Sequence, residues 1–391
     1  MTFPTIRPAL MLDFQKSRKL DPRITFSRAG SATYVDPVSG LIKTAPEGVA
    51  RFEKEGLVVE ANRTNYVTDN DQALRVQSNV TASQVPGPDG VSTSATRMTS
   101  VAAGNAVATN ATNRSIVWDS STTTTWSYFF KPVNLPDSVV YLGVVSGAGQ
   151  GTASVDYING TVTLSEKNID AGSYEVGNGW YRIWATYSDA LSNTAVMRFN
   201  AQFIATDAGQ YMDVYGMQVE IGNFSTSHIP TAGSTVTRAA DVVSISNAEM
   251  LKVVNPSGNA CLMTTNWYTS GANQERMFND GAGQMRVGQW RSNQIRSYRD
   301  GGNFTVSYTP ISGQENYNTV FESRDGNDVV IGNDAGAYGS NVSTTTLPGT
   351  QSFQFGYATG FQRKQVIARM FYYPQPLTQA ELEATSEAMT A

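Results

Sequence analysis

The chain has 391 residues, which is long enough for two or three domains that each bury a core of their own. Only 16% of the residues are charged, the net charge is −5, and Gly, Ser, Thr and Asn are abundant. This balance is typical of a loop-rich all-β protein and argues against global disorder and against a basic surface that binds nucleic acid. With one histidine, His228, and one cysteine, Cys261, the sequence also argues against a zinc site and against Ser-His or Cys-His catalysis.

Residues 1–63 have the pattern of an irregular leader. Short β-forming runs, such as 24–26 and 57–59, are separated by Gly, Pro and Asp, which predicts brief strands and loops without an independent core. We expect this leader to pack on the following domain or on a neighbouring subunit. Its first residues, MTFPTIRPALMLDF, lack a charged segment followed by a long apolar run, so we expect no secretory signal. No stretch of the sequence has the roughly 20 apolar residues of a membrane helix.

Residues 64–245 contain candidate strands at short spacing. In GWYRIWATYSD, two sets of residues alternate with period two: Tyr181, Ile183, Ala185 and Tyr187 against Trp180, Arg182, Trp184 and Thr186. The stretch YGMQVEI likewise predicts one face with Tyr215, Met217, Val219 and Ile221 and another with Gln218 and Glu220. The Asn-Gly pair of YINGTV is typical of a hairpin turn. Six or more such strands predict an antiparallel sandwich or jelly roll.

The one histidine and the one cysteine both have structural interpretations that involve no catalysis. The segment from Gly222 to Asp241 is rich in Ser and Thr and contains Pro230 and Gly233, which is the composition of an extended connector. We therefore expect His228 to be a connector residue. Cys261 lies between small and apolar residues and is expected to be a buried small hydrophobe.

Residues 246–391 have the pattern of a second β-rich unit. Candidate strands such as ACLMTTNWYT, QMRVGQW and DVVIGND are divided by Gly, Asn and Asp turns. The end of the chain, KQVIARMFYYPQPLTQAELEATSEAMTA, predicts a last strand and a short helix that begins with a capping box of Thr378 and Glu381. The sequence thus predicts an all-β chain with two antiparallel β-sandwich domains, jelly-roll over 64–245 and lectin-like over 246–391, after the leader 1–63.

Three pieces of the sequence, taken in order, resemble a family of bacteriophage and prophage virion proteins. They are LDPRITFSRAGSATYVDPVSGLI with GLVVEANRTN, then NGWYRIWATYSD, then YGMQVEIGNFSTSHIPTAGSTVTRAADVVSIS. In that family a carbohydrate-binding-module-like jelly roll follows a short leader. The C-terminal VIARMFYYPQPLTQAELEATSE resembles the last strand and helix of concanavalin-A-like, laminin-G-like domains. The resemblance implies lectin-like sandwiches used in adhesion or virion assembly, and it implies no catalytic residue.

Sugar binding by a β-sandwich rests on aromatic rings that stack on pyranose faces and on polar groups that bind the hydroxyls. The candidate residues are Trp118, Trp180, Trp184 and Trp290, the last with Arg291, Asn293 and Tyr298. For each ring, core packing or a subunit interface is the alternative. An acidic loop is the one candidate metal site, for structural calcium, with a plain Asp-Gly turn as the alternative; its residues are Asp325, Asn327 and Asp328. We expect no other cofactor.

The leading hypothesis is a non-enzymatic phage virion structural protein, a tail fibre or adhesin that attaches to a host-surface glycan. We expect it on the exterior of the particle after synthesis in the host cytoplasm, with the leader contacting other virion proteins. We expect a homo-oligomer, a trimer by analogy with phage fibres, in which weak sites act together. One alternative is a capsid decoration or tail assembly protein whose sandwiches bind other proteins. The second is a polysaccharide depolymerase tail spike, which needs two carboxylates about 5–10 Å apart; the candidates are Asp156, Glu166 and Glu220.

Overall fold

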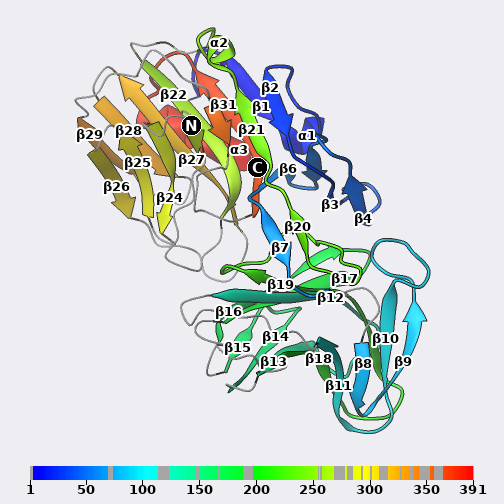
Figure 1. Cartoon of the computed structure of the whole chain (residues 1–391). Coiled ribbons are helices and arrows are strands. Elements are labelled where there is room, and N and C mark those ends of the chain that lie inside the picture. Colours follow the sequence, from blue (N-terminus) through cyan, green and yellow to red (C-terminus); the bar gives the residue numbers. More distant parts are fainter. Residues whose placement is uncertain are drawn as a thin grey trace. The chain divides into compact units, whose positions relative to one another are not determined.

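The chain folds into two compact all-β units, each assembled from separate segments (Figure 1). Unit 1 comprises Met1–Gly30, Pro46–Ala61 and Ala240–Ala391, and unit 2 comprises Ser31–Ala45 and Asn62–Ala239. The computed structural model describes residues 3–68, 74–112, 123–146, 149–165, 168–187, 197–253, 255, 258–267, 278–279, 285–291, 294–299, 302–307, 316–325, 328–333, 338–342, 353–355 and 364–390. Antiparallel pairing in both units confirms the predicted all-β fold class.

Unit 2 contains two six-stranded sheets, which we call sheet 2A and sheet 2B. Sheet 2A has the order β16-β17-β12-β19-β10-β9, with bounds β9 Val80–Val85, β10 Ala95–Ser100, β12 Thr124–Pro132, β16 Asn168–Gly177, β17 Trp180–Tyr187 and β19 Tyr211–Ile221. Sheet 2B has the order β15-β14-β13-β18-β11-β8, with bounds β8 Leu74–Ser78, β11 Gly104–Thr112, β13 Val139–Ser146, β14 Gly149–Asp156, β15 Val162–Leu164 and β18 Met197–Ala205. Two short pairs complete the unit: β3 Ala32–Val35 with β4 Ile42–Ala45, and β7 Arg63–Asn65 with β20 Val236–Arg238.

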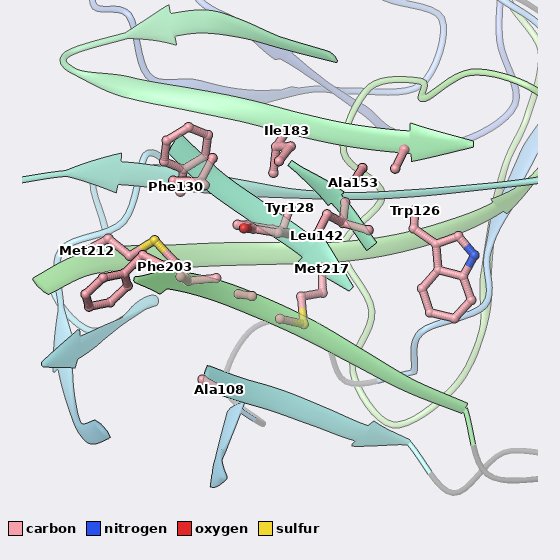
Figure 2. Close-up of a cluster of buried hydrophobic side chains, with 14 of the residues drawn as sticks. Ala108, Trp126, Tyr128, Phe130, Leu142, Ala153, Ile183, Phe203, Met212 and Met217 are labelled. Carbon is pink, nitrogen blue, oxygen red and sulfur yellow. The ribbon is translucent and has the colours of Figure 1, made fainter. Parts of the chain in front are cut away.

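The core of unit 2 lies between these two sheets. Figure 2 shows side chains of both sheets mixed in one apolar layer; they include Trp126, Tyr128, Phe130, Ile183, Met212 and Met217 of sheet 2A and Ala108, Leu142, Ala153 and Phe203 of sheet 2B. The fully buried hydroxyl of Tyr128 donates a hydrogen bond to the carbonyl oxygen of Tyr141 at 2.8 Å, so a polar group in this layer is satisfied across the sandwich. The predicted alternation of β17 is confirmed, because Ile183, Ala185 and Tyr187 all belong to this core.

Strand β19 departs from the alternation expected for it. Met217 and Val219 face the core, as predicted, but Tyr215 packs on the opposite side of sheet 2A. The cause is a β-bulge: Gly216 has a φ of +61°, and the register with β12 shifts between Ser127 and Phe129. An extra residue in one strand moves the following side chains to the other face, so the period of two is interrupted at the glycine. The Asn-Gly hairpin is confirmed, since β14 and β15 pair around residues 157–161.

Unit 1 contains an eight-stranded sheet 1A and a seven-stranded sheet 1B. Sheet 1A has the order β29-β28-β27-β22-β31-β6-β5, and β1 also pairs with β31; the bounds are β1 Leu10–Asp13, β5 Arg51–Glu53, β6 Gly56–Glu60, β22 Gly258–Trp267, β27 Asn316–Asp325, β28 Asp328–Asn333, β29 Tyr338–Val342 and β31 Lys364–Tyr373. Sheet 1B has the order β2-β21-β30-β23-β24-β25-β26, with bounds β2 Ile24–Ser27, β21 Val242–Ile245, β23 Phe278–Asn279, β24 Met285–Arg291, β25 Gln294–Arg299, β26 Gly302–Ser307 and β30 Phe353–Phe355.

Three helices occur among the described residues, all in unit 1: α1 Phe14–Ser17, α2 Asn247–Met250 and α3 Gln379–Thr390. The predicted capping box of α3 is present, because the Glu381 carboxylate accepts from the backbone N–H of Thr378 at 2.9 Å and the Thr378 hydroxyl accepts from the N–H of Glu381 at 3.4 Å. Leu382 and Met389 of this helix pack against Phe321 of sheet 1A. Within the described ranges, no helix has the length and apolar character needed to cross a membrane.

The leader does not stand apart as residues 1–63. It supplies β1, β2, β5 and β6 to unit 1 and β3, β4 and β7 to unit 2. Its apolar side chains enter the core between the sheets of unit 1; they include Leu10, Leu12, Phe14, Ile24, Leu57 and Val59. As predicted, these brief strands have no core of their own. The division of the structure therefore differs from 1–63, 64–245 and 246–391, because backbone pairing over more than 300 residues, such as Leu10 with Tyr372, leaves no local signal.

A fully buried ionic cluster in unit 1 joins residues that are far apart in sequence. The Asp241 carboxylate accepts from the guanidinium groups of Arg28, at 3.0 Å, and Arg51, at 2.5 Å, and from the backbone N–H of Glu60, at 2.9 Å. Arg51 also pairs with the Glu60 carboxylate at 2.9 Å. Asp241 thus compensates two buried cations and fixes the ends of three chain segments together.

Candidate functional site

Residues 224–231 pack on part of the outer face of sheet 2A, the side away from sheet 2B, where they contact β12, β17 and β19. Connector atoms are held by side chains of the sheet: the Gln218 side-chain oxygen accepts from Ile229 N–H at 2.7 Å, and Glu220 accepts from Thr226 N–H at 2.9 Å. Arg182 donates to the carbonyl oxygen of Thr226. This part of the connector is therefore packed structure, which the Ser/Thr-rich composition did not predict.

His228 is a packed residue of this covered region. It is 2% exposed, and its ring lies edge-on to Phe129, with centroids 5.7 Å apart, and 5.2 Å from the ring of Tyr215. A Cβ at Gly216 would stand 2.9 Å from His228 Cε1, so the bulge glycine makes room for the imidazole. Burial, with the nearby Arg182 guanidinium, lowers the pKa of His228 to about 3. The ring is neutral at neutral pH, and the prediction of a simple connector residue is corrected to a core position.

Trp180 and Arg182 belong to the same covered region. Trp180 is 4% exposed and clusters with Ile42, Ala95, Phe129 and Tyr215. Its ring has no open face for a ligand, and we therefore leave Trp180 out of the site. Arg182 is 1% exposed, donates to Ser127 Oγ at 2.9 Å and lies 4.9 Å from the centroid of the Phe129 ring.

Of the two predicted sugar-binding tryptophans whose side chains the structure describes, Trp184 reaches an open part of this face. It is partly exposed and lies opposite Gly172 in the pairing of β17 with β16. A Cβ at position 172 would stand only 3.1 Å from Trp184 Cζ2 and 3.3 Å from Nε1, so the indole passes directly over the glycine backbone. The missing side chain lets the ring lie across β16, at the edge of sheet 2A, where its outer surface is accessible.

Two polar residues of β16 accompany the indole. Asp170 and Tyr174 alternate with Ala171 and Ser173, so they share the outer face with Gly172, and both are partly exposed. Tyr174 pairs with Arg182 across the strands, and among the described residues the Nε–H of Arg182 has no hydrogen-bond acceptor. We call Asp170, Gly172, Tyr174 and Trp184 the β16–β17 face.

The β16–β17 face combines a fixed indole, a phenol and a carboxylate on one open strand pair. Such a surface suits a flat ligand with an apolar face and hydroxyl groups at its rim. Trp184 was predicted from the sequence, whereas its partners on β16 were not. The signal for them is the period-two pattern Asp170, Gly172, Tyr174 immediately before the predicted strand, with a glycine opposite the tryptophan.

The other sugar-binding and calcium candidates are described only in part. Trp118, Asn293 and Asn327 lie outside the described residues. For four other candidates the structure describes the backbone in a strand but not the side chain; they are Trp290 and Arg291 on β24, Tyr298 on β25 and Asp328 on β28. Asp325 is exposed and pairs with Asp328 where β27 and β28 meet. In the part of the chain that the structure describes, no three His, Cys, Asp or Glu residues are grouped to hold a metal.

Two of the carboxylates considered for hydrolysis, Glu220 and Asp156, take part in hydrogen bonds that hold the fold together. Glu220 is fully buried, accepts from Thr226 and lies 3.9 Å from Arg63. Asp156 holds the β14–β15 turn through the N–H groups of Asn159 and Ile158, each at 3.0 Å. The bond from the Asn159 N–H, together with bonds from the side chains of Ser138 and Asn159 and from the Ile158 N–H, lowers the pKa of Asp156 to about 2. Glu166 lies outside the described residues.

Cys261 is buried in unit 1 among apolar residues of the core, as predicted. Burial raises the pKa of its thiol, so the reactive thiolate is disfavoured.

Neither a protein-family model nor a curated protein sequence matches the chain. Among solved structures, the mouse laminin alpha1 chain, domains LG4-5, aligns at 10% identity over 76% of this chain and 91% of that chain, with a TM-score of 0.22. The N-terminal CBM22-1-CBM22-2 tandem domain of Paenibacillus barcinonensis Xyn10C aligns at 7% identity over 79% of this chain and 96% of that chain, with a TM-score of 0.27. Both TM-scores are low, and the all-β double-sandwich assignment rests on the strand pairing described above.

Proposed function

We propose that this chain is a non-enzymatic saccharide-binding protein and that the β16–β17 face of unit 2 is its binding site. The observation that carries the proposal is the Trp184 indole, which lies across Gly172 on an open edge of sheet 2A. Trp180 and Glu220 are buried residues of the same sheet, so Trp184 is the aromatic group on the outer face of β17 that a ligand reaches.

The chemistry of the face fits a pyranose. The C–H face of a sugar ring packs on an indole, which buries apolar area and favours a flat approach. Asp170 Oδ2 is buried, so the other carboxylate oxygen is the acceptor for sugar hydroxyls, and the Tyr174 phenol both donates and accepts. Such a shallow site gives weak single-site affinity, which several copies of the protein on one particle raise by avidity.

For the biological role we propose a phage virion protein, a tail fibre or adhesin that attaches the particle to a host-surface glycan. The support is the sequence resemblance over roughly residues 10–247. In this proposal the protein is a homotrimer on the exterior of the virion. Because the leader strands belong to the two units, its contact with other virion proteins uses exposed leader side chains, such as Met11 at 61% exposure.

The test is a glycan-array experiment with the full chain, since the leader supplies core residues. Wild type is compared with Trp184→Ala, with Gly172→Val, which displaces the indole without removing it, and with Tyr338→Ala, a control at a 36% exposed tyrosine of unit 1. We expect saturable binding that weakens about tenfold or more in the first two variants and is unchanged in the control.

Equal binding by all four folded proteins would place the saccharide site elsewhere. Absence of binding by folded wild type, at concentrations where avidity acts, would favour the capsid decoration or tail assembly role, in which the sandwiches bind proteins. Release of reducing sugar from a bound polysaccharide would favour the depolymerase.

A further inference from the structure

Three aromatic rings gather at one end of the unit 2 sandwich, apart from the β16–β17 face. Phe130 of β12 stacks with Tyr181 of β17, with centroids 5.6 Å apart and planes 24° from parallel. Tyr157, which follows β14, lies 5.4 Å from Phe130 and 5.0 Å from Tyr181. The three rings thus join both sheets of the sandwich at this end.

The two tyrosines differ from the phenylalanine in exposure. Phe130 is fully buried, whereas Tyr157 and Tyr181 are partly exposed, and the neighbouring turn residue Ile158 is 70% exposed. The buried phenyl ring fixes both phenols from below, so their positions are set before any ligand arrives. Fixed aromatic rings lose little entropy on binding, which is a property of efficient recognition surfaces.

Two carboxylates whose positions are fixed by hydrogen bonds, Asp156 and Asp137, act electrostatically on Tyr157. The Asp156 carboxylate accepts from the N–H groups of Ile158 and Asn159 and from Asn159 Nδ2 at 2.8 Å, which holds the turn that carries Tyr157. Asp137 is exposed and accepts from Val139 N–H at 3.0 Å through one carboxylate oxygen. Burial, the Tyr181 phenol, Asp137 and Asp156 all raise the pKa of Tyr157, which therefore remains a neutral hydroxyl that donates hydrogen bonds.

We propose that the Tyr157–Tyr181 pair is a second saccharide site of unit 2, independent of the β16–β17 face. The ligand class rests on the proposed function, and the site rests on the ring geometry. The planes of the two phenol rings are tilted by 52°. One ring offers its face for stacking on a saccharide and the other offers its edge, with carboxylate oxygens at the rim of the site. Tyr181 and Trp184 lie on opposite sides of β17, so a saccharide stacked on one does not reach the other, and each chain binds two ligands.

The experiment uses the full chain and two probes, the β-1,4-linked hexamers of glucose and of N-acetylglucosamine, together with any array-positive oligosaccharide. Calorimetry gives the stoichiometry, and amide NMR shifts of residues 157–160 report the second site. We expect two sites in wild type and one in Trp184→Ala. Adding Ile158→Asp to Trp184→Ala should weaken binding at the remaining site about tenfold. Ile158 is exposed, so its substitution leaves the fold intact. Tyr157→Ala, checked for folding, should abolish binding at the Tyr157–Tyr181 pair, whereas Tyr157→Phe should retain the stacking of the saccharide on the ring.

The outcomes separate the two proposals. If Trp184→Ala removes all saturable binding, or if residues 157–160 do not respond in a protein that binds, the second site is refuted and the first stands. If Trp184→Ala has no effect while the turn variants abolish binding, the second site is supported and the β16–β17 face is refuted. If folded wild type binds none of the probes and no array glycan, both proposals fail.

Discussion

Acidification should destabilise unit 2 through His228, the chain's one histidine. Burial, with Arg182 nearby, lowers its pKa from 6.5 to about 3 in the folded protein. Because the pKa of His228 is lower in the folded state, the unfolded chain takes up this proton at a higher pH than the folded chain does. The contribution of the neutral ring to the free energy of unfolding is therefore fully present above pH 6.5 and is lost as the pH falls toward 3. Integrating this difference from pH 7 to pH 5 gives a loss of about 2 kcal/mol in the free energy of unfolding.

The assay is urea unfolding of wild type and His228→Phe at pH 7 and pH 5, with hydrogen exchange of β12 and β19 peptides to identify the unit 2 transition. The variant keeps a ring but does not titrate. Both proteins have the same carboxylates. The difference between their losses of unfolding free energy from pH 7 to pH 5 therefore reports the titration of His228 alone, whatever the variant's stability at pH 7. We expect wild type to lose about 2 kcal/mol more than the variant. Equal losses would show that His228 is not buried as a neutral ring and would refute the reasoning.

Three further predictions concern unit 1. Asp241→Asn leaves two buried guanidinium groups undercompensated and should cost about 3–5 kcal/mol in urea unfolding; a cost under 1 kcal/mol would contradict the ionic cluster. Gly56→Ala should disrupt the pairing of β6 with β31, because φ is +147° and a Cβ would stand 2.1 Å from the Ile367 carbonyl oxygen; unchanged hydrogen-exchange protection of β31 would disprove this. Deleting residues 1–63 removes at least six core side chains, worth about 10 kcal/mol, so the remainder should show no cooperative unfolding of unit 1 by calorimetry; a normal transition would contradict the assignment.

Much of the fold follows from local pattern. The alternation in β17, the Asn-Gly turn after β14 and the capping box of α3 each depend on residues close in sequence, and each is present. The leader shows where such reasoning ends. The strands at Leu10–Asp13 and Gly56–Glu60 find their partner in β31, and the free energy of that pairing depends on a surface assembled from distant segments.

Only part of the candidate site could be predicted from the sequence, because burial of its residues also depends on distant segments. Trp180 and Trp184 belong to one alternating stretch and occupy the same face, yet one is buried and the other partly exposed. Ile42 of the β3–β4 pair packs in the cluster that buries Trp180, and this contact is not recognisable from the strand itself. The bulge at Gly216, which turns Tyr215 toward His228, is likewise visible only once the chain packs.

The most direct test of saccharide binding is calorimetric titration of full-length wild type and Trp184→Ala with the strongest array-positive oligosaccharide, each protein checked for native unfolding. Loss of one binding site in the variant, with the same site lost in Gly172→Val, is the predicted result. Identical titrations of wild type and both variants would contradict the claim that the indole over β16 binds the ligand.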